Sequence, residues 1–248
     1  MGNFYETDEQ LGQYLDFHYG PAHFGVPNFP RACARHCLSL PRPAADSRAL
    51  DLGCAVGCAT FELAHGYTHV TGVDLSQRFV EAARTLAAEG RMNYHVRDEG
   101  ELTHTARAEL GALTLAETAP RVSFHHGDAG DLTVAAGRYD LVFAGNLIDR
   151  LAEPARFLRE LAQRLVPGGY LVIASPYTLL EAFTPRENWI GGYRDASGET
   201  ITMRDGLNQC LAEHFSAVGS PFDLPFVIRE TRRKYQHSVA EVTTWQRR

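Results

Sequence analysis

Residues 49–57 read Ala49-Leu50-Asp51-Leu52-Gly53-Cys54-Ala55-Val56-Gly57, and this stretch decides the fold. Its apolar start predicts the end of a short buried strand, and its two glycines allow a tight turn with close approach of the backbone to a ligand. A helix is expected next, followed by a second strand, residues 70–74, that ends in Asp74. This succession is typical of the nucleoside-binding half of a doubly wound α/β sheet, in which the Asp binds ribose hydroxyls.

The spacing of the glycines distinguishes two cofactors. A dinucleotide site needs Gly-x-Gly-x-x-Gly, and the three positions here hold Gly53, Ala55 and Cys58. The pattern Asp51-x-Gly53-x-Ala55-x-Gly57 instead resembles the first motif of class I S-adenosylmethionine-dependent methyltransferases, with Ala in place of the middle Gly. That cofactor carries no phosphate, and the loop carries no Lys or Arg. A glycine turn in an ordinary α/β protein is the structural alternative.

The ends of two later strands complete the expected cofactor site. Residues 121–129 predict a third strand, whose Gly127-Asp128-Ala129 end resembles the methyltransferase motif that binds the adenine amino group. Residues 139–146 predict a nearly continuous apolar fourth strand, as expected for a parallel strand covered on both faces. Ligands of open parallel sheets bind beyond the carboxyl ends of the strands. The expected cofactor-binding residues are Asp51, Gly53, Cys54, Ala55, Gly57, Asp74, Leu75, Asp128, Ala129 and Asn146.

Length, composition and charge narrow the class of protein. The chain has 248 residues, 44% hydrophobic and 22% charged, enough for one large α/β domain with additions. A net charge of −6 without a long basic run argues against nucleic acid and favours a small-molecule substrate. No apolar stretch approaches the roughly 20 residues of a membrane span, and the N-terminus lacks the regions of a signal peptide.

The cysteines and histidines raise a metal alternative. Five cysteines, an odd number in a chain of this size, fit a reduced cytoplasm. The pairs Cys33/Cys37 and Cys54/Cys58 suggest zinc, but no clustered His accompanies them, which favours small buried thiols. His125-His126 adjoin on a predicted strand and point to opposite faces, so strand packing is favoured over metal binding. No metal is expected.

The predicted fold is a doubly wound, Rossmann-like α/β sheet, mostly parallel, with seven strands of which the last is antiparallel. One domain is expected, with a helical lid over residues 1–48, a cofactor-binding core over 49–174, a substrate-side insert over 175–203, and a helix and strand pair over 204–248. Further helices are expected at about 8–17, from Asn28 to Leu40, from Ser76 to Gly90, from Glu153 to Leu165 and at 205–214. Strands are also expected at 170–174, 226–229 and 236–245.

Two segments have alternative interpretations. The turn-rich aromatic stretch of residues 17–30 is either a packed N-terminal cover or a lid that closes over the cofactor. Residues 91–120 predict an extra hairpin around Gly100, interpreted as an appendage or an oligomer contact without a chemical role. The insert of residues 175–203 is rich in aromatic residues and Arg, and it leaves the carboxyl end of a strand, so it is expected to line the substrate pocket.

Several motifs outside the cofactor site resemble one family, the 5-thiohistidine N-methyltransferases of ovothiol biosynthesis, over about Phe4 to Trp245. The resemblance rests on the segments Phe17-His18-Tyr19-Gly20, Phe24-Gly25-Val26-Pro27-Asn28-Phe29-Pro30, Asp51 to Gly57, Asn146-Leu147-Ile148-Asp149-Arg150-Leu151, Ser175-Pro176-Tyr177, Phe183-Thr184-Pro185-Arg186 and Pro225 to Thr231. Position 58 differs, with Cys where relatives often carry Arg.

The resemblance implies a cytoplasmic enzyme that methylates an imidazole nitrogen of 5-thiohistidine to give ovothiol A. The cofactor would be S-adenosylmethionine, released as S-adenosylhomocysteine, with a sulfoxide synthase as a transient partner and no nucleic acid or membrane involved. Two rivals remain. One is a methyltransferase acting on another small molecule, and the other is a non-catalytic S-adenosylmethionine-binding partner of a synthase.

Selectivity for nitrogen over sulfur sets the expected catalytic residues. Asp149 is the first candidate to accept the ring proton or fix the tautomer, with His18 and Tyr177 behind it. The alternative for Asp149 is a salt bridge with Arg150. The substrate carboxylate needs a guanidinium, for which the candidates in order are Arg186, Arg229 and Arg150. The other expected substrate contacts are Tyr19, Asn28, Asp149 and Tyr177.

Overall fold

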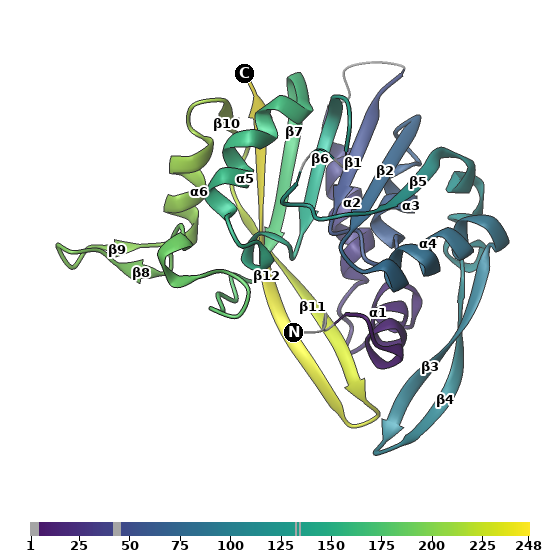
Figure 1. The fold of residues 1–248 in the computed structure, drawn as a ribbon. Coiled ribbons are helices and arrows are strands. Elements are labelled where there is room, and N and C mark those ends of the chain that lie inside the picture. Colours follow the sequence, from purple (N-terminus) through teal and green to yellow (C-terminus); the bar gives the residue numbers. More distant parts are fainter. Residues whose placement is uncertain (1–4, 42–45, 132, 134) are drawn as a thin grey trace.

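One twisted sheet carries the fold in the computed structural model, which describes residues 5–41, 46–131, 133 and 135–248 (Figure 1). Phe4, where the family resemblance begins, lies outside these residues. Seven strands follow the order β10-β12-β7-β6-β1-β2-β5, and an eighth, β11, pairs with β12. Their bounds are β1 Arg48–Leu52, β2 His69–Asp74, β5 Val122–His126, β6 Tyr139–Gly145, β7 Leu165–Ser175, β10 Phe215–Ala217, β11 Phe222–Thr231 and β12 Lys234–Arg247.

The predicted doubly wound topology is confirmed. Strands β5, β2, β1, β6 and β7 run parallel, and β12 pairs antiparallel with β7. The chain builds outward from β1 through β2 to β5 and then returns to the other side of β1 to form β6. The carboxyl ends of β1 and β6 therefore flank the topological switch point, where open α/β sheets bind their ligands.

Helices cover both faces of the sheet, and the central strands carry buried apolar side chains on both faces. Leu141 and Val172 pack in one buried cluster with α2 and α3, whereas Val142 and Leu171 pack in another with α5 and α6. Adjacent residues on a strand point to opposite faces, so apolar residues at both positions need two covering layers. The helices are α1 Asp8–Tyr19, α2 Phe29–Ser39, α3 Cys58–Leu63, α4 Gln77–Glu89, α5 Pro154–Glu160 and α6 Met203–Leu211.

The predicted helix caps are largely confirmed. Asn28 and Ser76 accept the backbone N–H groups of Arg31 and Phe79, and Gly90 ends α4 with a left-handed φ of 73°. Thr7 likewise accepts from the backbone of Gln10. The sequence Thr7-x-x-Gln10 would allow a capping box, but only half of it forms, because the side-chain oxygen of Gln10 has no hydrogen-bond partner among the described residues.

The predicted number of strands and three predicted boundaries were wrong. The sheet has eight strands rather than seven, because β11 pairs with β12 along most of its length. The helix expected to reach Leu165 ends at Glu160, and a 3₁₀ turn, Leu161–Arg164, follows. Pro167-Gly168-Gly169, expected to separate helix and strand, lies inside β7, which tolerates it at an irregularity in the pairing with β6. The helix expected at 205–214 spans Met203–Leu211, with Thr202 as its cap.

The insert after α4 forms the predicted hairpin, β3 Arg91–Glu99 and β4 Leu102–Glu109, which packs against α1 (Figure 1). Gly12 of α1 lies so close that a Cβ there would overlap the carbonyl oxygen of His95. Asp98 pairs with Arg229 of β11 at 2.7 Å. The hairpin is thus not a free appendage, because it joins α1 to the β11–β12 hairpin.

The segment after β7 is mostly irregular. It contains a 3₁₀ turn, Arg186–Asn188, and a two-stranded hairpin, β8 Tyr193–Arg194 and β9 Thr200–Ile201, that extends away from the sheet (Figure 1). Two other 3₁₀ turns, Gly111–Leu113 and Ala116–Arg121, precede β5, and a third, Ile148–Arg150, follows β6. In the part of the chain that the structure describes, no helix is both long and apolar enough to cross a bilayer.

Candidate active site

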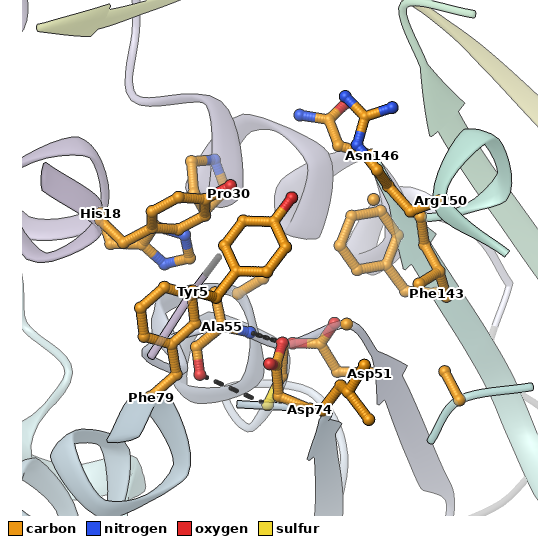
Figure 2. Close-up of a pocket in the computed structure, with 18 of the residues that line it drawn as sticks. Tyr5, His18, Pro30, Asp51, Ala55, Asp74, Phe79, Phe143, Asn146 and Arg150 are labelled. Atoms are coloured by element: carbon orange, nitrogen blue, oxygen red, sulfur yellow. Dashed lines mark hydrogen bonds between the residues drawn. The ribbon is translucent and has the colours of Figure 1, made fainter. Parts of the chain in front are cut away.

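A cavity opens at the carboxyl ends of β1, β2 and β6, beneath α1 (Figure 2). His18 and Pro30 lie on one side, Asn146 and Arg150 on the other, and Asp51 and Asp74 at its base. Of the ten residues expected to bind the cofactor, all but Gly57 line this cavity. The sheet therefore brings together residues that lie up to 95 positions apart, from Asp51 to Asn146.

The glycine turn has the backbone that its sequence pattern predicts. Gly53 and Gly57 have φ values of 73° and 88°. A Cβ at Gly57 would lie 2.7 Å from ring atoms of Phe124, so Gly57 shapes the turn rather than lining the cavity. Ala55, where the motif usually has Gly, also has a positive φ of 47°. This strained conformation directs its N–H to Asp74 Oδ2 at 2.8 Å.

Two carboxylates at the base of the cavity have raised pKa values. Burial raises the pKa of Asp74 to about 6, although the N–H groups of Ser76 and Ala55 donate to it and partly oppose the shift. Burial likewise raises the pKa of Asp51 to about 7, opposed by the hydroxyl of Thr60, which donates at 2.6 Å. Perturbed carboxylates in a cavity are typical of a binding or catalytic site.

These residues fit the nucleoside cofactor that the sequence predicts. Asp74 stands at the end of β2 with its oxygens fixed by the backbone, as a ribose-binding carboxylate should. The next residue, Leu75, is 53% exposed although apolar, and it lines the cavity where an adenine would need an apolar contact. Asn146 has a positive φ of 51° and a buried side-chain oxygen without a partner in the described chain. An unpartnered buried acceptor indicates a ligand that donates hydrogen bonds.

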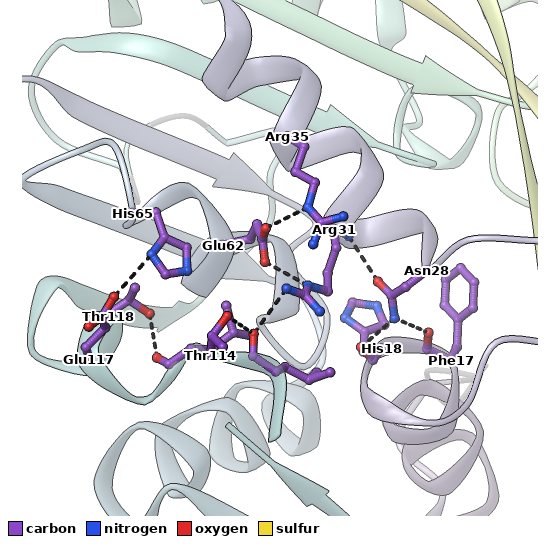
Figure 3. Close-up of polar contacts among 12 residues, drawn as sticks. Phe17, His18, Asn28, Arg31, Arg35, Glu62, His65, Thr114, Glu117 and Thr118 are labelled. Carbon is purple, nitrogen blue, oxygen red and sulfur yellow. Dashed lines mark hydrogen bonds and ion pairs between the residues drawn. The ribbon is translucent and has the colours of Figure 1, made fainter. Parts of the chain in front are cut away.

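His18 is the candidate catalytic residue that reaches the cavity. It is only 6% exposed, and burial lowers its pKa to about 3, so the imidazole is neutral at physiological pH. Its Nδ1 is buried without a partner among the described residues. The backbone carbonyl of His18 accepts from Asn28 Nδ2 at 2.9 Å (Figure 3), and Tyr19 donates to the carbonyl of Val56 at 2.7 Å. Asn28 and Tyr19, expected at the substrate, hold α1 against α2 and the glycine turn and do not line the cavity.

Asp149 and Arg150 form the salt bridge that was the alternative interpretation. Asp149 is 0% exposed, does not line the cavity, and accepts from Arg150 Nη1 and from the backbone of Thr178, both at 3.0 Å. Arg150 lines the cavity, and its guanidinium lies 4.8 Å from the centre of the Phe183 ring. The 3₁₀ turn after β6 thus directs Arg150 toward the cavity and Asp149 away from it.

Three other expected substrate residues lie outside the cavity. Tyr177 donates to Glu241 at 2.9 Å, and Glu241 also pairs with Arg204. The guanidinium of Arg186 lies over the rings of Trp189 and Tyr193, at 4.7 and 4.9 Å. Arg229 forms a salt bridge with Asp98. None of Tyr177, Arg186 and Arg229 is brought to the cavity.

Aromatic side chains that the sequence did not assign to the site form much of its wall. Tyr14 and Phe17 lie on α1 with His18, and Phe79 and Phe143 come from α4 and β6. Positions 14, 17 and 18 are spaced for one face of a helix, and this spacing could have identified them.

A cluster of charged residues joins α2 to α3 beside the cavity. Arg31 and Arg35 of α2 pair with the buried Glu62 of α3 at 2.8 and 3.0 Å, and Arg31 also donates to the carbonyl of Leu113 (Figure 3). Burial raises the pKa of the four thiols considered for zinc, Cys33, Cys37, Cys54 and Cys58. Among the described residues, no three His, Cys, Asp or Glu side chains are arranged to hold a metal ion.

Comparison with known proteins gives the family. The model for a methyltransferase domain matches residues 50–173. A ubiquinone biosynthesis O-methyltransferase of Caulobacter sp. (strain K31) is 32% identical over 136 residues, 54% of this chain and 43% of that protein. Its counterpart from Aromatoleum aromaticum is 26% identical over 53% of this chain and 44% of that protein. The chain therefore matches less than half the length of these curated relatives.

Solved structures agree with the fold. The N-methyltransferase NodS from Bradyrhizobium japonicum WM9, in complex with S-adenosyl-L-homocysteine, aligns with a TM-score of 0.52 and 16% identity, over 96% of this chain and 98% of that chain. The [4+2]-cyclase SpnF aligns with a TM-score of 0.54 and 18% identity, over 97% and 96%. The chain belongs to the methyltransferase domain family, and it has the class I S-adenosylmethionine-dependent fold.

Proposed function

We propose that this member of the methyltransferase family methylates an imidazole nitrogen of 5-thiohistidine and so forms ovothiol A. The observation that carries the proposal is Arg150, a guanidinium held by Asp149 at the wall of a cavity whose other walls are largely aromatic. Such a cavity suits an acceptor with a flat ring and a carboxylate. The sequence resemblance in segments outside the cofactor motifs supports the same acceptor.

The geometry of the cavity base supports a role in cofactor binding for each of the following residues. Asp74 would bind the ribose hydroxyls, Asp128 the adenine amino group, and the turn from Gly53 to Ala55 the amino-acid part of S-adenosylmethionine. S-adenosylmethionine supplies an activated methyl group. The chain's own task is therefore to align the acceptor nitrogen and to exclude the competing sulfur.

Selectivity for nitrogen would depend on how the ring is held. The buried Nδ1 of His18 offers one neutral hydrogen-bonding position that fixes the ring tautomer. Arg150 would bind the carboxylate at the other end of the acceptor. Asp149 would then act as a positioning residue through Arg150, and direct proton acceptance by Asp149 is the competing assignment.

A methyltransferase acting on another small molecule is the second candidate, because the curated relatives are named as ubiquinone O-methyltransferases. A non-catalytic S-adenosylmethionine-binding partner of a sulfoxide synthase is the third candidate. A sulfoxide synthase that supplies 5-thiohistidine is the partner we propose for the first function.

The test is incubation of the purified protein with S-adenosylmethionine and 5-thiohistidine, followed by mass spectrometry and NMR of the product. We expect one added methyl group on a ring nitrogen and equimolar S-adenosylhomocysteine. The same incubation without protein is the control for enzyme-independent methylation. Exclusive S-methylation would contradict the proposal. Cofactor binding without product would favour a different acceptor or the binding role.

A further inference from the structure

A groove leads from the cavity to the surface between α1 and the β11–β12 hairpin. It shares five lining residues with the cavity, namely Tyr5, Tyr14, Asn146, Arg150 and Ile228. In Figure 1, α1 lies between the β11–β12 hairpin and the β3–β4 hairpin beyond one end of the sheet. The shared residues mark the junction where an acceptor entering through the groove would meet the cofactor.

The groove carries an unusual buried acceptor. Gln10 of α1 lines it and is only 9% exposed, yet its Oε1 has no partner among the described residues. One turn along the same helix, Gln13 also lines the groove, but its amide already donates to the carbonyl of Arg229 at 3.0 Å. Asn146 at the junction has the second unpartnered oxygen. Leaving two buried acceptors unpaired is costly unless a ligand supplies donors.

Among the described residues, one nitrogen makes the hydrogen bonds of the guanidinium at the junction, and the Phe183 ring lies against its face. Arg150 donates through Nη1 to the carbonyl of Asp149, to the carboxylate of Asp149 and to the carbonyl of Thr178, at 3.0, 3.0 and 3.1 Å. A single nitrogen, Nη1, thus donates to all three acceptors. Within the described chain, the N–H groups of Nε and Nη2 remain for a ligand. The other charges of the groove are paired, Arg97 with Glu9 and Lys234 with Glu230.

We propose that the junction, together with the adjoining part of the groove where Gln10 lies, binds the zwitterionic head group of an α-amino acid. The carboxylate is bound by Arg150, and the ammonium donates to the side-chain oxygens of Gln10 and Asn146. An ammonium can donate to both neutral oxygens at once, because it has three donors and no acceptor. This inference rests on the proposed function in placing the acceptor ring in the cavity, and it adds the recognition of the amino group.

The test measures binding by calorimetry to the full-length protein saturated with S-adenosylhomocysteine. The probes are 5-thiohistidine, histidine, histamine, which lacks the carboxylate, and imidazolepropionate, which lacks the amine. Loss of either charged group should weaken binding at least about tenfold, the scale of one charge-assisted hydrogen bond. Arg150→Met should weaken histidine binding similarly but leave histamine binding unchanged. Gln10→Leu should weaken histidine binding but not imidazolepropionate binding.

Matched variants separate recognition from folding. Gln163→Leu removes an exposed glutamine in the turn Leu161–Arg164, outside the groove, and Arg156→Met removes an exposed guanidinium that pairs with Glu153 and Glu160. Both should bind histidine as the wild type does. Thermal unfolding of Gln10→Leu should show no loss of stability, since the variant removes an unpaired buried oxygen. A structural role for Gln10 would instead lower stability.

The outcomes also separate this inference from the proposed function. Equal binding of histidine and histamine, or wild-type histidine affinity in Arg150→Met, overturns the head-group site even if 5-thiohistidine is methylated. Absence of binding by both histidine and 5-thiohistidine overturns it too. Head-group-dependent binding of 5-thiohistidine without methyl transfer would keep the site and refute the proposed function.

Discussion

Asp149→Asn tests whether the buried carboxylate acts through Arg150. Asp149 holds Arg150 Nη1 and the backbone N–H of Thr178 with one oxygen, and its other oxygen has no partner among the described residues. An Asn of the same shape keeps one acceptor but removes the charge. The guanidinium of Arg150 then loses its ion pair and its fixed orientation.

The structure sets the size of the effect. Breaking a fully buried ion pair costs about 3–5 kcal/mol, but the Arg150 side chain is 27% exposed, so solvent screens part of this loss. We expect the free energy of unfolding to fall by about 1–3 kcal/mol. A less ordered guanidinium should lose about 1–2 kcal/mol of acceptor binding, which raises KM for the acceptor about 5- to 30-fold. The kcat at saturating acceptor should fall less than about tenfold.

Steady-state kinetics over a range of acceptor concentrations, combined with single-turnover measurements, provide the assay. Arg150→Lys, which keeps the charge but not the fork, should show the same rise in KM with an unchanged pH profile. A drop of about a hundredfold in kcat with an unchanged KM would refute this reasoning. It would show that Asp149 accepts the acceptor proton itself. Some S-methyl product from either variant would show that the ring had turned in the cavity.

Four further predictions concern the cofactor site. Asp74→Asn keeps the shape of the side chain but loses the charge and one of the two acceptors that bind the N–H groups of Ala55 and Ser76, so S-adenosylmethionine should bind at least about tenfold more weakly by calorimetry. Burial raises the pKa of Asp74 to about 6, and the ribose hydroxyls bind its carboxylate form. Cofactor affinity should therefore fall as the pH drops below 6, by up to about tenfold per pH unit. Asp74→Asn should lack this pH dependence. Gly57→Ala places a Cβ 2.7 Å from Phe124 at a φ of 88°, so urea unfolding should show a loss of about 2–5 kcal/mol, and wild-type stability would contradict the described turn. Activity should survive exhaustive chelation, whereas its loss with EDTA and recovery with one divalent ion would reveal a metal requirement.

The residues at the base of the cavity were predictable because local signals determine where they lie. Gly53, Asp74 and Asp128 each end or follow a strand, and the parallel sheet places all strand ends at one edge. The caps at Asn28 and Ser76 were equally local. Sequence reasoning therefore works well where a residue's role depends on its own strand or helix.

The acceptor half depends on contacts between distant segments. A salt bridge with Asp98, 131 positions away in the sequence, holds Arg229 outside the cavity. A hydrogen bond to Glu241, 64 positions away, holds Tyr177 outside it. The orientations of Asp149 and Arg150 follow from a 3₁₀ turn whose direction no residue pattern specifies. The order Arg186, Arg229, Arg150 for carboxylate binding could therefore not be decided from the sequence.

The close approach of Gly12 to His95 has a mechanical consequence. Helix and strand touch there backbone to backbone, with Arg97 paired to Glu9 and Tyr94 bonded to Asp16 on either side. Such an interlocked contact resists sliding and rolling, so α1 and the β3–β4 hairpin should move as a single rigid body. The base of the hairpin is closed by the hydrogen bond from Leu110 to the carbonyl of Gly90, a glycine with a left-handed backbone. Because Asp98 also ties the hairpin to Arg229 of β11, a force on the outer end of the hairpin would be transmitted to the helix that carries Tyr14 and His18 at the cavity wall.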